Sequence, residues 1–174
     1  GAAAHRATLA GSAIPSTAVL LFPGAAPVGY DTDRLEPDPT SAIIDLGTSG
    51  PVNLTTRISD RGATAATEAA TSAMRRCLSA PTVDPGCPLD PAGSRSVPGT
   101  LRGTVTSTSV SQPPALVDDD RDGLVEVQGR FTVLGSWLTL DFDNIAARRS
   151  GSTSVSFRLR VYVTGATAVS WMGP

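Results

Sequence analysis

The chain contains two cysteines, Cys77 and Cys87, and their spacing constrains its fold more than any other feature. The segment between them comes directly after a stretch with helical periodicity. It holds Pro81, Pro85 and Gly86, which favour a turn. A metal site would need further cysteine or histidine ligands, which the chain lacks. The spacing therefore predicts a disulfide. A disulfide indicates an oxidising compartment outside the cytoplasm, at the cell surface or in the envelope.

Composition excludes several classes of function. All fourteen cationic side chains are arginine, they are scattered, and the net charge is −2, so nucleic acid is not an expected partner. The chain has no lysine, and its single histidine, His5, lies in the N-terminal tail, so nucleophilic catalysis lacks a base within the fold. We therefore do not expect this chain to be an enzyme. A hydrolase that uses only two carboxylates remains an alternative.

Three segments differ in composition and periodicity. Residues 1–15 are rich in alanine, glycine and serine without periodicity, which predicts a flexible tail or juxtamembrane linker. Residues 16–58 alternate apolar segments with proline and glycine, which predicts a small β module with strands at 18–22, 27–30, 41–46 and 52–58. Residues 59–174 are predicted to form a second module that holds one helix, the disulfide loop and an antiparallel sheet.

The helix of the second module has clear start and stop signals. Ser59 or Asp60 can cap its first turn, and Pro81 prevents its continuation. Small or apolar residues recur at three-and-four spacing, which predicts a face that packs closely on a sheet: Ala63, Ala66, Ala70, Met74, Cys77 and Leu78.

Two segments alternate apolar and polar residues, 125–133 and 155–163, which predicts strands with one buried and one exposed face. Gly135 and Ser136 are predicted to form a two-residue hairpin turn. A second turn, over 144–153, would then gather a polar surface that could bind an anionic or planar partner: Arg130, Trp137, Asp141, Arg158, Arg160 and Tyr162. The main interpretation of these residues is cross-strand pairing that only stabilises the sheet, and partner binding is the alternative.

An acidic segment at 118–124 matches the start of a calcium-binding loop. Alternate acids point to one side of such a loop, glycine allows its sharp turn, and a backbone carbonyl supplies a further ligand. The ligands would be Asp118, Asp120, Asp122, the carbonyl of Leu124, and Glu126. The main interpretation is a solvated acidic turn between two strands, with no cofactor. Calcium is the alternative, and its binding would be weak because Gly129 occupies the position where the full motif has a bidentate glutamate.

Two resemblances add to this interpretation. Leu21-Phe22-Pro23-Gly24 followed by Val28-Gly29-Tyr30 resembles the small prealbumin-type or PEGA-type β modules of bacterial surface proteins. The order of β module, helix, Cys77, Cys87 and Pro88, and antiparallel meander over residues 16–172 is similar to the ectodomains of uncharacterised actinobacterial single-pass envelope proteins. This second resemblance implies an upstream transmembrane anchor outside this chain, and it implies no catalytic residues.

We therefore expect an α+β fold that is mostly β, with one helix packed on a curved antiparallel sheet in a cystatin-like or nuclear-transport-factor-like manner. The expected function is a non-catalytic interaction or scaffold domain whose partner is an envelope protein or a cell-wall component. Contact with the membrane would come only through a segment absent from this chain. A module that binds a small ligand or a cell-wall fragment between helix and sheet is the main alternative. A core filled with aliphatic side chains would favour scaffolding, and an inward polar pocket would favour ligand binding.

Overall fold

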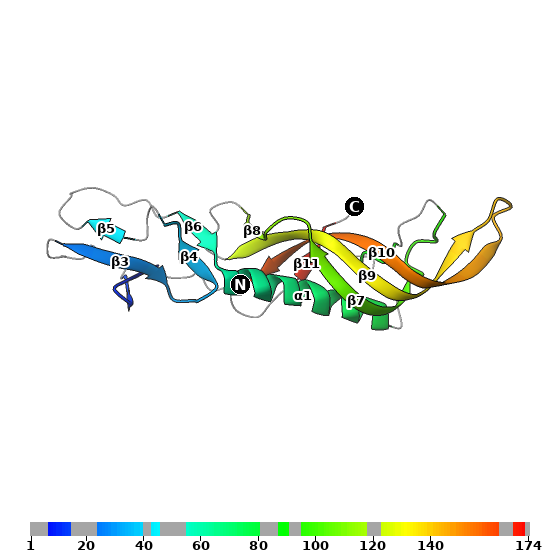
Figure 1. The fold of residues 1–174 in the computed structure, drawn as a ribbon, viewed down its shortest axis with the longest axis horizontal. Coiled ribbons are helices and arrows are strands. Elements are labelled where there is room, and N and C mark those ends of the chain that lie inside the picture. The colour runs from blue at the N-terminus through cyan, green and yellow to red at the C-terminus, as the bar shows by residue number, and fades with distance from the viewer. Residues whose placement is uncertain are drawn as a thin grey trace.

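The computed structural model describes residues 7–14, 24–39, 43–45, 55–80, 87–90, 95–117, 123–163 and 169–172. These residues form one helix and a set of strands (Figure 1). In chain order the elements are β1 (Ala7–Leu9), β2 (Ser12–Ala13), β3 (Ala25–Tyr30), β4 (Leu35–Pro37), β5 (Ile43–Asp45), β6 (Thr56–Ile58), α1 (Asp60–Ser79), β7 (Arg102–Val110), β8 (Ala115–Leu116), β9 (Leu124–Leu140), β10 (Ala146–Tyr162) and β11 (Val169–Trp171).

The main sheet is antiparallel, with the order β11-β10-β9-β7, and β8 adds a short pairing to the start of β9. α1 lies along one face of this sheet, and the long strands β9 and β10 curve past it (Figure 1). The predicted α+β class, with one helix on a curved antiparallel sheet, is confirmed.

The helix begins where its capping signal predicts. The Ser59 hydroxyl accepts a hydrogen bond from the backbone N–H of Gly62 at 3.1 Å and donates one to the carbonyl of Asp33 at 2.7 Å. This cap satisfies one of the free N–H groups of the first turn and ties the helix to the segment before β4. At the other end, Ala80 is extended. Within α1 the buried face is built on small residues, which let the helix lie close to the sheet: Gly62, Ala66, Ala70 and Ala73, joined by Met74, Cys77 and Leu78.

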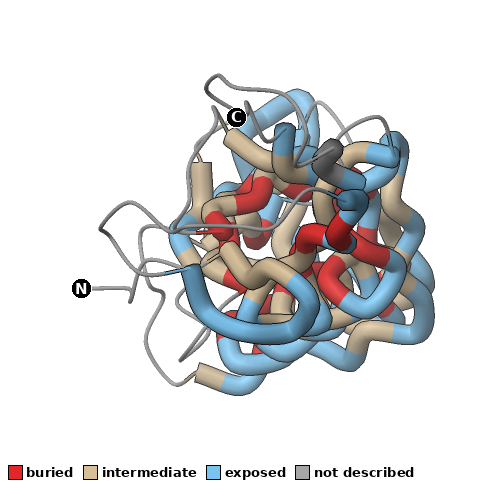
Figure 2. The backbone as a smooth tube through the Cα atoms, turned by 90° about the vertical axis from the view of Figure 1, so that its left-hand side faces the viewer, coloured by how far each residue is buried: buried red, intermediate tan, exposed pale blue. Residues whose placement is uncertain are grey.

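The core fills the layer between α1 and the sheet. Alternate residues of β9 and β10 point into it, as the period of two predicts, and their neighbours face outward. Figure 2 shows the buried segments gathered in the middle of the molecule, with exposed segments around them. The buried sheet residues are Val125, Val127, Phe131, Val133, Val155, Phe157, Leu159, Val161 and Val163.

The predicted hairpin turn at Gly135 and Ser136 is wrong. β9 runs straight through both residues to Leu140, and β10 starts at Ala146. Gly135 pairs with Gly103 on one side and with Gly151 on the other. A Cβ atom on Gly135 would overlap the carbonyl oxygen of Arg102. Glycine is therefore required at this position because the backbones of neighbouring strands lie close together, and not because the chain turns.

The true turn between β9 and β10 spans residues 141–145. The Asp141 carboxylate accepts hydrogen bonds from the backbone N–H groups of Asp143 at 2.9 Å and Ile145 at 2.7 Å. Asn144 adopts a positive φ of 60°, which asparagine tolerates better than most residues. Residues 141–150 are all exposed, and this end of the β9–β10 hairpin projects beyond α1 (Figure 1).

The N-terminal region forms small sheets. Residues 7–13 form the hairpin of β1 and β2 instead of the predicted tail. The hairpin closes through a turn at Ala10 and Gly11, which both have positive φ. Its first strand, β1, pairs with β3. β3 pairs with β5, and β4 pairs with β6. Leu35 of β4 is buried within the main core. The predicted strand at 18–22 lies outside the described residues.

Candidate functional site

The outward face of the main sheet gathers polar and charged side chains from β9 and β10. Glu126 lies opposite Arg160, Gln128 opposite Arg158, and Arg130 opposite Ser156. All these residues have even numbers, so their side chains lie on the face away from α1. We call Glu126, Gln128, Arg130, Arg158, Arg160 and Tyr162 the polar face.

Glu126 is the centre of this polar face. Its carboxylate accepts hydrogen bonds from Arg158 Nε at 2.8 Å and Arg158 Nη2 at 3.1 Å, and a third from Gln128 Nε2 at 2.6 Å. These bonds, from Arg158 first and then Gln128, hold the pKa of the Glu126 carboxyl below its ordinary value, and the charges of Arg158 and Arg160 act in the same direction. The same pair raises the pKa of Arg158.

The polar face carries a net positive charge. Its acid, Glu126, is held by Arg158, while Arg130 and Arg160 form no ion pair among the described residues. The Nε atom of Arg160 is buried and has no hydrogen-bond partner there. A surface of this kind attracts anionic groups more readily than cationic ones.

The structure brings together four of the six residues predicted for a partner surface: Arg130, Arg158, Arg160 and Tyr162. The other two belong elsewhere. Trp137 lies on the opposite face, where it packs against the core, and it pairs with Arg149 instead of Arg160. Asp141 closes the turn at the end of the hairpin. Both errors follow from the misplaced turn, since moving it changes the register of the whole strand pair.

The predicted calcium ligands Asp118, Asp120 and Asp122 lie outside the described residues. Leu124 opens β9, and the carboxylate of Glu126 is already bound by Arg158 and Gln128. Within the described ranges, no cluster of three or more histidine, cysteine, aspartate or glutamate side chains could hold a metal ion. Calcium binding stays a prediction, and a cation at Glu126 would have to displace Arg158.

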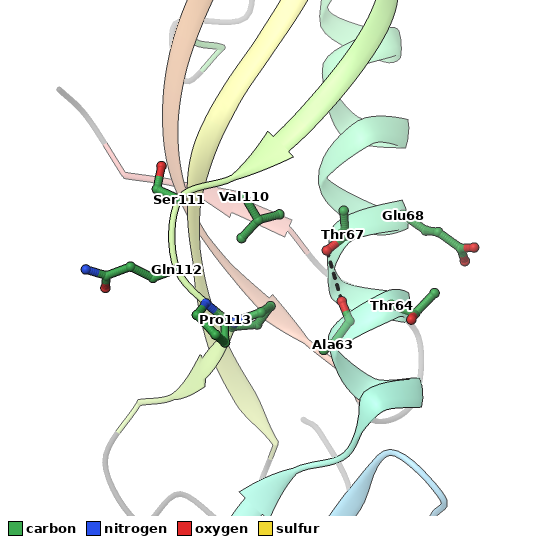
Figure 3. A pocket seen from close by; sticks show the side chains of 9 residues that line it. Ala63, Thr64, Thr67, Glu68, Val110, Ser111, Gln112 and Pro113 are labelled. Atoms are coloured by element: carbon green, nitrogen blue, oxygen red, sulfur yellow. Dashed lines mark hydrogen bonds between the residues drawn. The ribbon is translucent and has the colours of Figure 1, made fainter.

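A shallow groove of about 490 Å³ lies between the first turns of α1 and the connection from β7 to β8. Figure 3 shows Val110 and Pro113 facing Ala63 and Thr67 across it, while Glu68 points away. The Thr67 hydroxyl donates to the carbonyl of Ala63 at 3.0 Å. The lining is therefore mostly apolar, and no group that could transfer a proton points inward. No motif in the sequence predicts this groove.

The predicted disulfide is present. Cys77 is buried in the last turn of α1, Cys87 is half-buried, and their Cα atoms lie 5.8 Å apart. Such a bond is typical of proteins that fold in an oxidising, extracytoplasmic environment. In the described part of the chain, no helix has the length and apolar character needed to cross a bilayer.

Comparisons with protein-family models, with curated proteins and with solved structures found no match to this chain. The resemblances to envelope ectodomains, to prealbumin-type or PEGA-type modules and to cystatin-like folds stay predictions.

Glu126 makes the stability of the fold depend on pH. Because its pKa is lowered in the folded state, the carboxylate stabilises the fold above the ordinary glutamate pKa, and this contribution is lost as pH falls through the folded value. Glu126→Gln should therefore lower the melting temperature by about 1 to 2 °C at pH 7, and this deficit should shrink as pH falls below the ordinary glutamate pKa. Glu68→Gln, at an exposed position on α1, is the control. A pH-independent deficit in Glu126→Gln would contradict the ion-pair interpretation.

Proposed function

We propose that this chain is a non-catalytic interaction or scaffold domain of a cell-envelope protein, exposed outside the cytoplasm and anchored through an upstream membrane segment. Its partner would be an envelope protein or a cell-wall component with anionic groups. The disulfide supports the compartment, and the polar face supports the partner chemistry.

The observation that carries this proposal is the filled layer between α1 and the sheet. The buried side chains of β9 and β10 are aliphatic or aromatic, and most are 0 to 1% exposed. They form one buried cluster with Ala66, Ala70 and Met74 of the helix. A ligand-binding cone needs an open, partly polar space in this layer. A filled apolar layer instead supports a rigid scaffold that presents its outer surface.

The groove beside Val110 and Pro113 favours the second candidate, a module that binds a small apolar ligand. Its lining suits an apolar group, but it lacks the converging polar side chains that orient a ligand in most binding sites. We therefore place this function second.

A carboxylate hydrolase is the third candidate. Asp33, Asp60 and Glu68 border one shallow depression near the start of α1. However, Arg61 donates a hydrogen bond to the Asp33 carboxylate at 2.6 Å and lowers its pKa. A general acid needs a raised pKa, so this arrangement opposes the required chemistry.

Replacing Arg158 and Arg160 with serine tests the proposed function. Arg158 is 51% exposed, so loss of its ion pair should change the melting temperature by no more than about 2 °C. Capture of anionic envelope components should fall at least about tenfold if the polar face binds them.

The matched control is Arg57→Ser with Arg75→Ser. This variant makes the same change of charge and also removes one surface ion pair, between Arg57 and Glu36, but it lies away from the polar face. Equal losses of capture in both variants would reduce the effect to net charge. Full capture by the first variant would contradict the proposed surface.

A further inference from the structure

The outer edge of β10 has little cover. β11 pairs with β10 only at residues 159–161, and Met172 extends the contact by donating its backbone N–H to the carbonyl of Arg158 at 2.9 Å. Among the described residues, none pairs with the outer edge from 146 to 157. The opposite side of the hairpin is covered, because β7 and a bridge from Ser96 to Thr139 follow β9.

The backbone groups on this open edge belong to a row of serines. Since the carbonyl of Arg158 points outward to Met172, the even-numbered residues of β10 direct their N–H and C=O groups to that edge. Between Arg148 and Arg158 these are Ser150, Ser152, Ser154 and Ser156. Edge strands of soluble proteins usually carry lysine, proline or inward charges that prevent pairing. Residues 150–157 contain none of these, so the edge is open to another strand.

We propose that this edge pairs antiparallel with the same edge of a second copy of the chain, related by a two-fold axis near Gly151. In this register Ser150 lies opposite Ser152 of the second copy, and Arg148 lies opposite its Ser154. Serine pairs of this kind can exchange hydrogen bonds across strands, and no two arginines face each other directly. The symmetry repeats every contact twice.

Charge complementarity favours a second copy as the occupant. The register carries the end of each hairpin, with Asp141 and Asp143, to β11 of the other copy, next to the strand segment that holds Arg158 and Arg160. It also brings Ile145, which is 63% exposed, to position 157 of the second copy, beside the half-buried Trp171 and Met172. An anionic lipid surface fits less well, because the same two aspartates would repel it.

This pairing does not depend on the proposed function, since it uses the strand edge and is measured on the purified chain alone. The experiment is sedimentation of the disulfide-bonded chain from about 1 µM to 1 mM, the range in which an interface of modest size associates. A concentration-dependent monomer–dimer equilibrium is the expected result. A monomer at every concentration would overturn the proposal.

Two substitutions at one position test the register. Ser154→Glu places an acid opposite Arg148 of the second copy and should tighten the dimer about fivefold, because the pair occurs twice. Ser154→Arg places like charges together and should weaken it by a similar factor. Ser154 is half-buried on an outer strand, and both monomers should melt close to wild type. If the dissociation constant of the dimer shifted in the same direction in both variants, or in neither, the proposed pairing would be overturned.

Discussion

Replacing Phe131 with alanine should cost the fold about 3 to 5 kcal/mol, the range typical of buried phenylalanine. Phe131 is 0% exposed at the centre of β9. Its ring stacks on Phe157 with centroids 4.1 Å apart and meets Trp171 edge-on at 6.5 Å. The substitution removes both ring contacts and leaves a cavity between β9, β10 and β11. Such a loss is a large share of the 5 to 15 kcal/mol that stabilises a typical domain.

Chemical denaturation of Phe131→Ala and Phe142→Ala checks this expectation. Phe142 undergoes the same chemical change, but it is 89% exposed and its ring contacts only the guanidinium of Arg95, at 3.5 Å, among the interactions described. Its loss should cost less than about 1 kcal/mol. If the two variants had similar stability, the aromatic cluster would not be the centre of the core.

The main sheet could be predicted because its strands alternate strictly. The apolar residues of β9 all have odd numbers: Val125, Val127, Phe131 and Val133. A residue pattern with a period of two leaves a single choice of buried face. The helix could be predicted equally well, since Ser59 provides a cap and the following alanines keep a helical spacing. These signals are local in sequence.

The hairpin could not be placed by the same reasoning. Glycine and serine at 135–136 satisfy a two-residue turn, yet Gly135 is required for close contact with β7, which is far away in sequence. One local signal was present. Trp137 has an odd number, like Phe131 and Val133, so an uninterrupted strand would direct its side chain into the core. The candidate site inherits this error, because two of its six residues depended on the turn.

The groove beside Val110 illustrates a different limit. It exists because the segment 111–114 passes over the first turns of α1, and no property of either segment alone indicates their contact. The ion pair of Glu126 and Arg158 is similar, since it required the correct register of two long strands.

Reduction of the disulfide between Cys77 and Cys87 should lower stability by roughly 2.5 to 3 kcal/mol, as the chain-entropy model gives for a separation of ten residues. The bond connects the last turn of α1 to the segment that carries Leu89, which is 1% exposed. Without it, the unfolded chain regains conformational freedom while the native contacts of Leu78 and Leu89 remain. The melting temperature should therefore fall by roughly 5 to 10 °C with the fold retained.

Thermal unfolding with and without a phosphine reductant measures this effect, and the double variant Cys77→Ala, Cys87→Ala provides its control. The variant should melt near the reduced wild type and should not respond to the reductant. A variant that melts well below reduced wild type would assign the difference to packing of the buried Cys77 side chain. If native material carried two free thiols by mass spectrometry, the bond would not form in the cell. The extracytoplasmic assignment would then lose its main support, because that assignment depends on an oxidising environment.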